Sequence, residues 1–120
     1  MLIYTGYFDL VEKYRADWFC CVSIAGRTPE GFQGVKYPKL APLKSWWTEW
    51  KEKGLNEEWY IKQYQETVLG KFVVEEVMKD FQSLGNRIIL LCYEKPYKFC
   101  HRHLVASWFR KQGVEVNEYD

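Results

Sequence analysis

Residues 87–93 read Arg-Ile-Ile-Leu-Leu-Cys-Tyr, and this is the clearest buried strand that the chain contains. A short, almost uninterrupted apolar run bounded by turn residues predicts a strand covered on both faces, as in a parallel sheet. A turn containing Pro96 follows, and a helical pattern then runs from about Cys100 to Gln112. Since parallel strands need a crossover connection, usually a helix, this segment predicts a parallel sheet.

Similar strand and helix patterns lie on both sides of this segment. Leu2–Phe8 predicts a first strand, Asp9–Lys13 a brief helix with Asp9 as its N-cap, Trp18–Ile24 a second buried strand, and Val114–Tyr119 a last short strand. Strands that alternate with helices predict an α/β fold. We therefore expect a compact Rossmann-like three-layer domain, with a mostly parallel sheet of about four strands and helices on both faces.

The middle of the chain divides into a loop and three helical patterns. Gly26–Leu43 is rich in Gly and Pro, so we expect no regular element there, and a loop of that length is often functional. The helices are predicted over Ser45–Lys53, Asn56–Leu69 and Phe72–Leu84, with Ser45 and Asn56 as N-caps and with Gly54, Gly70 and Gly85 as stops.

Length and charge limit the classes of function. The chain has 120 residues, 48% of them hydrophobic, which predicts one domain over residues 1–120 with its own core. Seventeen Lys and Arg oppose 16 Asp and Glu, so the net charge of +1 disfavours bulk nucleic-acid binding. A small anionic ligand held by a few cations remains possible, and a protein partner is also left open.

The cysteines and the apolar runs indicate a compartment. Two of the four cysteines, Cys20 and Cys21, are adjacent in an apolar run, and the amino-terminal residues do not resemble a signal peptide. No apolar run approaches the roughly 20 residues that span a bilayer. We therefore expect reduced thiols, a cytoplasmic location and no membrane association.

Residues 91–103 hold both histidines and two of the four cysteines, at the point where a buried strand ends and a helix begins. The first N–H groups of a helix lack partners and attract anions, and the same field favours a cysteine thiolate. Cys100 is placed for both effects. The coincidence of several polar residue types at one strand end predicts a functional site.

Helical periodicity sorts the side chains after Cys100. An apolar stripe predicts the buried face of this helix, and it comprises Leu104, Val105, Trp108 and Phe109. His101 points to the middle of that stripe and should be buried near the site, whereas His103 falls on the polar face and should be solvated. Arg102 lies at the edge of the stripe, where its guanidinium would face an anion at the rim of the site.

Each of these residues also has a purely structural interpretation. Cys92 is on composition a small buried hydrophobe, His101 a hydrogen-bonded core residue, Cys100 an inert first-turn residue, and Arg102 a partner for Glu94. The tryptophans at positions 46, 47 and 50 are explained most simply by helix packing, with base stacking as the alternative.

Three kinds of chemistry fit the segment. Cys100 is a candidate nucleophile with His101 as its base and Glu94 as a third candidate catalytic residue. Cys92, Cys100 and a histidine are zinc-ligand types, but the Cys-x7-Cys-His spacing is not a standard zinc pattern and no fourth ligand is evident, so no metal is predicted. A binding role, in which the helix terminus and Arg102 hold a phosphate, requires the least. The sequence leaves the cofactor open.

The sequence resembles a bacterial and phage family catalogued as domain of unknown function 488. The resemblance lies in three stretches: Ile3-Tyr4-Thr5, the loop pattern Pro29, Phe32, Gly34, Tyr37 and Leu40-Ala41-Pro42, and the pair Leu90-Leu91-Cys92-Tyr93-Glu94-Lys95-Pro96 and Phe99-Cys100-His101-Arg102-His103-Leu104-Val105. Val114–Glu118 is similar but less specific.

The resemblance implies one pocket at the carboxyl ends of the strands, and it does not say whether that pocket reacts or only binds. We expect the ligand-binding residues to be Arg102, Cys92, Thr5, Arg27, Gly34 and Tyr37. The ligand expected there is a nucleotide or another small phosphorylated compound. The alternatives are a non-catalytic interaction or ligand-sequestering protein of phage or bacterial origin, and a Cys/His metal or redox site.

Overall fold

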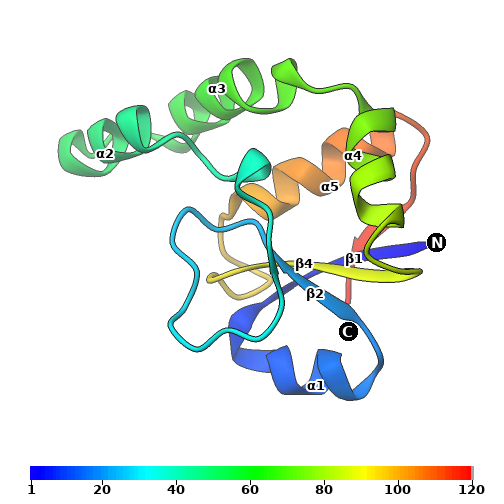
Figure 1. Cartoon of the computed structure of the whole chain (residues 1–120). Helices are drawn as coiled ribbons and strands as arrows, with labels where there is room; N and C mark the ends of the chain where they lie inside the picture. The colour runs from blue at the N-terminus through cyan, green and yellow to red at the C-terminus, as the bar shows by residue number, and fades with distance from the viewer. Residues whose placement is uncertain (120) are drawn as a thin grey trace.

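The computed structural model describes residues 1–119 and contains one five-stranded sheet, shown in Figure 1. All of its strand pairs are parallel. From one edge to the other the strands are β3 (Val35–Lys36), β2 (Cys20–Ser23), β4 (Arg87–Cys92), β1 (Leu2–Tyr7) and β5 (Val116–Glu118). The predicted α/β fold with a parallel sheet is confirmed, with five strands where about four were expected.

Strand β4 is the centre of the sheet because its sequence lets it be covered on both faces. Ile88 to Leu91 are fully buried, and their side chains alternate between two separate apolar clusters. In the register of the sheet Tyr7 of β1 pairs with Cys92, and Ser23 of β2 pairs with Leu91. The carboxyl ends of these three strands therefore meet at one edge, where parallel sheets bind their ligands.

Helices cover both faces of the sheet (Figure 1). The short helix α1 (Val11–Ala16) lies on one face, and its Tyr14 belongs to the cluster that contains Ile89 and Leu91. The other helices are on the opposite side: α2 (Lys44–Lys53), α3 (Glu57–Thr67), α4 (Val74–Gln82) and α5 (His101–Lys111). Helices α2 and α3 pack together, and α2 extends beyond the carboxyl edge of the sheet (Figure 1).

Of the three predicted N-caps, one was right and two were wrong. The side chain of Asn56 accepts a hydrogen bond from the backbone N–H of Trp59 at 2.9 Å, as an N-cap does. Ser45 is not a cap, since α2 begins one residue earlier at Lys44. Asp9 is not a cap either, because it lies within a 3₁₀ turn that precedes α1.

The expectation of no regular element in Gly26–Leu43 was wrong. This segment contains β3 and a 3₁₀ turn over Pro38–Leu40, and a further 3₁₀ turn covers Leu69–Lys71. Strand β3 pairs with β2 at close range, since a Cβ atom on Gly34 would lie 2.5 Å from the carbonyl oxygen of Cys21. None of the helices within residues 1–119 has the length and apolar content needed to cross a bilayer.

Candidate functional site

A cleft of about 1110 Å³ opens at the carboxyl edge of the sheet, between α2 and the segments that follow β2 and β4. Its charged side chains are three cations and one carboxylate, namely Arg27, Lys44, Lys51 and Glu94. Its aromatic lining comprises Trp47, Trp50, Tyr60, Tyr93 and Phe99. The remaining polar groups in its wall are Cys92, Cys100 and His101. The cleft is therefore cationic, rich in aromatic rings, and lined by two cysteine sulfurs and an imidazole.

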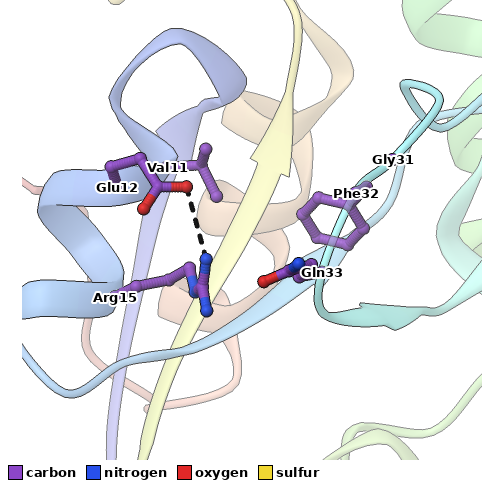
Figure 2. A pocket seen from close by; sticks show the side chains of 6 residues that line it. All are labelled: Val11, Glu12, Arg15, Gly31, Phe32 and Gln33. Atoms are coloured by element: carbon purple, nitrogen blue, oxygen red, sulfur yellow. Dashed lines mark hydrogen bonds and ion pairs between the residues drawn. The ribbon is translucent and has the colours of Figure 1, made fainter.

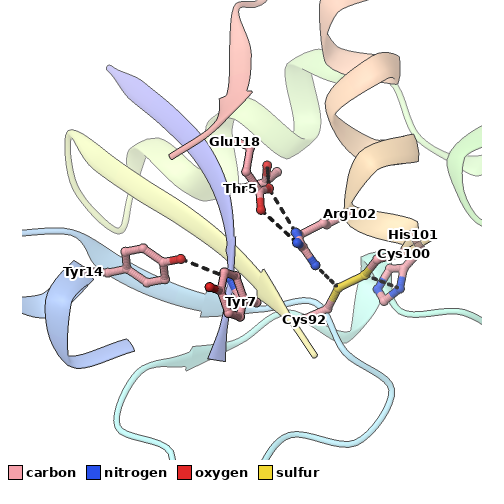
Figure 3. Close-up of polar contacts among 8 residues, drawn as sticks. All are labelled: Thr5, Tyr7, Tyr14, Cys92, Cys100, His101, Arg102 and Glu118. Carbon is pink, nitrogen blue, oxygen red and sulfur yellow. Dashed lines mark hydrogen bonds and ion pairs between the residues drawn. A yellow bond between two sulfur atoms is a disulfide. The ribbon is translucent and has the colours of Figure 1, made fainter. Parts of the chain in front are cut away.

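A disulfide joins Cys92 to Cys100 in the wall of this cleft (Figure 3), so the expectation of reduced thiols was wrong for this pair. Cys92 is the last residue of β4 and Cys100 is the N-cap of α5, so the strand-to-helix turn brings them together. Their Cα atoms are 7.4 Å apart, which is wider than in most disulfides. That separation is also compatible with two free thiols or with two ligands of one metal ion.

His101 is buried, as the apolar stripe predicted, with 7% of its surface exposed. Its Nε2 lies 2.6 Å from the carbonyl oxygen of Ile24, and because a carbonyl only accepts, Nε2 carries the hydrogen. The unprotonated Nδ1 faces the Sγ of Cys100 at 3.9 Å. Burial lowers the pKa of His101 to about 4, against the opposing effect of the Ile24 carbonyl, so the ring is neutral at pH 7.

Arg102 is not at the rim of the site, and that prediction was wrong. Its side chain is fully buried, and its guanidinium donates from Nε and Nη2 to the two carboxylate oxygens of Glu118 at 3.1 and 2.8 Å. The remaining arm, Nη1, donates to the Sγ of Cys92 at 3.3 Å (Figure 3). Nor does Arg102 pair with Glu94, which is exposed. Glu118 is the last residue of β5, which lies beside α5, and its carboxylate forms an ion pair with Arg102.

Thr5 belongs to this buried pair and does not line the cleft. Its hydroxyl donates to the Oε1 of Glu118 at 2.6 Å (Figure 3). Burial alone would raise the pKa of Glu118, but the hydrogen bonds from Arg102 and Thr5 outweigh burial and hold it below its usual value. The expected single pocket that collects all the shared polar residues is therefore divided into two neighbouring sites.

Two further predicted ligand residues also lie away from the cleft lining. Tyr37 is buried, and its hydroxyl donates to Asp80 on α4 at 2.6 Å; burial, with that carboxylate, raises its pKa. Gly34 permits the close pairing of β3 with β2. Arg27, in contrast, does line the cleft, and its carbonyl oxygen accepts a hydrogen bond from the Tyr93 hydroxyl, which ties the two loops together.

His103 is half-buried, so the prediction that it is solvated was wrong. Its Nε2 is inaccessible and has no hydrogen-bond partner among the described residues. Burial lowers its pKa, and the positive charge of Arg102 lowers it further. The backbone of Lys98, in the turn that precedes α5, lies close enough to the ring to oppose these effects and raise its pKa.

One group of side chains within residues 1–119 has the ligand types and the spacing for a metal ion. The ligand atoms of Cys92, Cys100 and His101 all lie within 4.8 Å of one another. Two thiolates and one imidazole suit Zn²⁺, and the hydrogen bond from His101 Nε2 to Ile24 is the usual orienting contact of a metal-bound histidine. The set supplies three ligands, and it would have to be reduced before it could bind a metal.

Several residues of the site were missed from the sequence. Lys44 and Lys51 are ordinary helix-surface lysines in sequence, and only the position of α2 over the cleft gives them a role. Glu118 follows β4 by more than twenty residues and meets Arg102 because β5 joins the sheet beside β1. The sequence offered one signal for Glu118. It is a carboxylate near the end of the last predicted strand, two residues after the apolar Val116.

A second hollow of about 180 Å³ lies between α1 and the loop before β3, lined by Val11, Glu12, Arg15, Gly31, Phe32 and Gln33 (Figure 2). Its cation is already paired, since Arg15 donates to Glu12 at 3.3 Å. No thiol or imidazole lines it. The larger cleft is therefore the better candidate for a functional site.

Comparison with protein families matches residues 15–113 to DUF488-N3a, which is described as the active DUF488-N3 subclade. The matched range includes β2, the loop with Arg27, all of β4 and α5, and therefore both cysteines and the histidine of the cleft. Comparison with curated proteins and with solved structures finds no match. Since the family match covers most of the chain, this protein belongs to the domain of unknown function 488 family.

Proposed function

We propose that the cleft binds a nucleotide or a similar small phosphorylated compound and presents it to the Cys100 and His101 side chains. The observation that carries the proposal is the combination of cations and flat rings in the lining of one cleft. Arg27, Lys44 and Lys51 oppose the single carboxylate of Glu94, which favours an anionic ligand. The aromatic side chains beside them offer faces on which a base can stack.

The size of the cleft supports the same ligand class. A volume of about 1110 Å³ is slightly larger than the usual range for small-molecule sites, about 300–1,000 Å³. The Nζ of Lys51 lies 5.0 Å from the centre of the Trp47 ring, so a cation and a stacking surface are presented side by side. A phosphate and a base on the same small molecule would meet both.

A reacting version of the site assigns roles to the residues nearest the ligand. Reduced Cys100 is the candidate nucleophile, and His101 Nδ1 is the adjacent acceptor for its proton. Arg102 contacts Cys92 and not the cleft, so we assign it a positioning role in place of ligand binding.

Thermal denaturation with AMP, adenosine and inorganic phosphate tests the binding proposal. At a concentration of about 100 Kd, AMP should stabilise the fold by about 3 kcal/mol, while adenosine and phosphate alone should have smaller effects. A Lys44→Met, Lys51→Met double variant should lose most of that shift. Lys53→Met is the matched control, because Lys53 lies on the same helix, is exposed and pairs with Glu49 at 3.0 Å. A shift that is equal in both variants, or no shift with any phosphorylated compound, would reject the proposal.

A further inference from the structure

The disulfide lies where the buried cluster that contains Ile89 and Leu91 meets the cleft, so it packs in the core and also lines a pocket. Both cysteines line the cleft, and Cys100 is the more accessible, with 6% of its surface exposed against 1% for Cys92. The other two thiols are different. Cys20 and Cys21 are free, and burial raises the pKa of Cys21 to about 11, so it stays a protonated, inert thiol.

The two sulfur atoms of the disulfide have different neighbours. The Sγ of Cys92 accepts a hydrogen bond from the buried guanidinium of Arg102 at 3.3 Å, which favours a thiolate at this position when the bond opens. Cys100 is the more exposed of the two residues, and its Sγ lies 3.9 Å from the unprotonated Nδ1 of His101. One sulfur is thus placed to leave as a thiolate and the other to be attacked.

We propose that Cys92 and Cys100 are a reversible dithiol–disulfide pair that exchanges with a small anionic thiol bound in the cleft. Cys100 is the sulfur that exchanges, and Cys92 is the resolving sulfur. The choice of an anionic thiol rests on the proposed function, since it uses the same cations, Lys44 and Lys51. A thiol carried on a nucleotide would use the aromatic wall as well.

The exchange balances in two steps. An incoming thiolate attacks the Sγ of Cys100, the bond to Cys92 breaks, and Cys92 leaves with the electron pair as a thiolate beside Arg102. A second thiolate then attacks the outer sulfur of the mixed disulfide, which releases Cys100 as a thiolate. Two small thiols are oxidised to their disulfide, the protein disulfide is reduced, and the two protons of the small thiols end on the cysteines. The reverse sequence oxidises the protein.

The test starts from fully reduced, desalted protein and offers it three disulfides: glutathione disulfide, coenzyme A disulfide and cystamine. Oxidation is followed by intact mass and by release of the small thiol. The two anionic disulfides should react about tenfold or more faster than the cationic cystamine, as electrostatic attraction to the cleft predicts. This comparison needs no variant, so it does not depend on a substituted protein folding.

Variants then assign the sulfurs. Cys92→Ser should accumulate a mixed disulfide on Cys100, whereas Cys100→Ser should accumulate far less adduct on Cys92. Cys20→Ser is the control and should react like the unsubstituted protein, because Cys20 is outside the pair and the cleft. The Lys44→Met, Lys51→Met variant should slow glutathione disulfide about tenfold and should speed cystamine, because the charge that attracts the anion repels the cation.

Three results would overturn the inference. They are reaction no faster than that of a free cysteine peptide, equal adducts on Cys92 and Cys100, and a stoichiometric metal that both thiols retain in place of a disulfide. The AMP shift measured on the same samples separates the two proposals. If AMP still stabilises the fold but no thiol–disulfide exchange is seen, only the exchange proposal is rejected. Exchange that shows no charge preference, with no AMP shift, rejects the cleft as an anion-binding site as well as the choice of thiol.

Discussion

Removing the carboxylate of Glu118 should destabilise the whole domain, because Glu118 neutralises a cation that has no access to water. Arg102 is fully buried, and two of its three hydrogen-bonding arms end on Glu118. In Glu118→Ala both arms lose their partner, and so does the hydroxyl of Thr5. The structure has no second carboxylate in ion-pair contact with Arg102 among residues 1–119.

The expected loss of stability follows from how deeply Arg102 and Glu118 are buried. Leaving one member of a buried ion pair without its partner costs about 3–5 kcal/mol. The Glu118 side chain is 21% exposed, so water can reach part of the vacated space, and we expect the lower end, about 3 kcal/mol. For a domain of this size that loss lowers Tm by roughly 10 °C. Replacing both partners, Arg102→Met with Glu118→Leu, should cost less than Glu118→Ala alone.

Urea denaturation at pH 7 is the assay, with Glu115→Ala as the control from an exposed position three residues earlier. Stability should also depend on pH. Since the folded-state pKa of Glu118 is below its unfolded value of 4.5, the stabilisation is present above about pH 4.5 and is lost as the pH falls through the folded pKa. The reasoning fails if Glu118→Ala changes the free energy of unfolding by no more than Glu115→Ala does, at an unchanged m-value.

Two further predictions concern His101 and Gly34. The pKa of His101 is about 4 in the fold and 6.5 when unfolded, so acidification from pH 6.5 to 4 should remove about 3 kcal/mol of stability as the unfolded chain takes up the proton. His101→Gln should flatten that slope in urea titrations across this range, and an unchanged slope would contradict the assignment. Gly34→Ala should cost about 1–3 kcal/mol because its methyl group would meet the backbone of Cys21 at 2.5 Å. Gly26→Ala, with open space around it, is the control, and equal thermal stability of the two variants would show that β3 moves aside freely.

Local periodicity was enough to predict the sheet centre and the burial of His101. The run at 87–93 is apolar at almost every position, and the stripe on α5 repeats at helical spacing, so both features can be read within a dozen residues. The family resemblance drew attention to the same segment, and the cleft lies there. Both predictions were right because each depends only on the residue pattern within a single strand or helix.

The partner of Arg102 could not be found in that way. Helical geometry placed Arg102 at the edge of the apolar stripe, but what lies beside that edge is set by β5, which pairs with β1 at the other end of the chain. The positive charge of the cleft could not be predicted either. Lys44 and Lys51 lie on α2, and no local sequence pattern says where α2 packs relative to the sheet. Residues that meet only through tertiary packing were therefore missed or misplaced.

The strand order also has a consequence for how the chain acquires its structure. Strand β1 pairs with β4 on one side and with β5 on the other. Ile3 therefore pairs with Ile88 in one ladder and with Val116 in the other, and both partners are distant in the sequence. Contacts between such distant segments slow folding, because a long loop must close before they form. During synthesis the first strand remains unpaired until residues 87–92 have been made. The buried charge of Arg102 is neutralised only after residue 118 has been added, so a growing chain carries this cation without its partner until then.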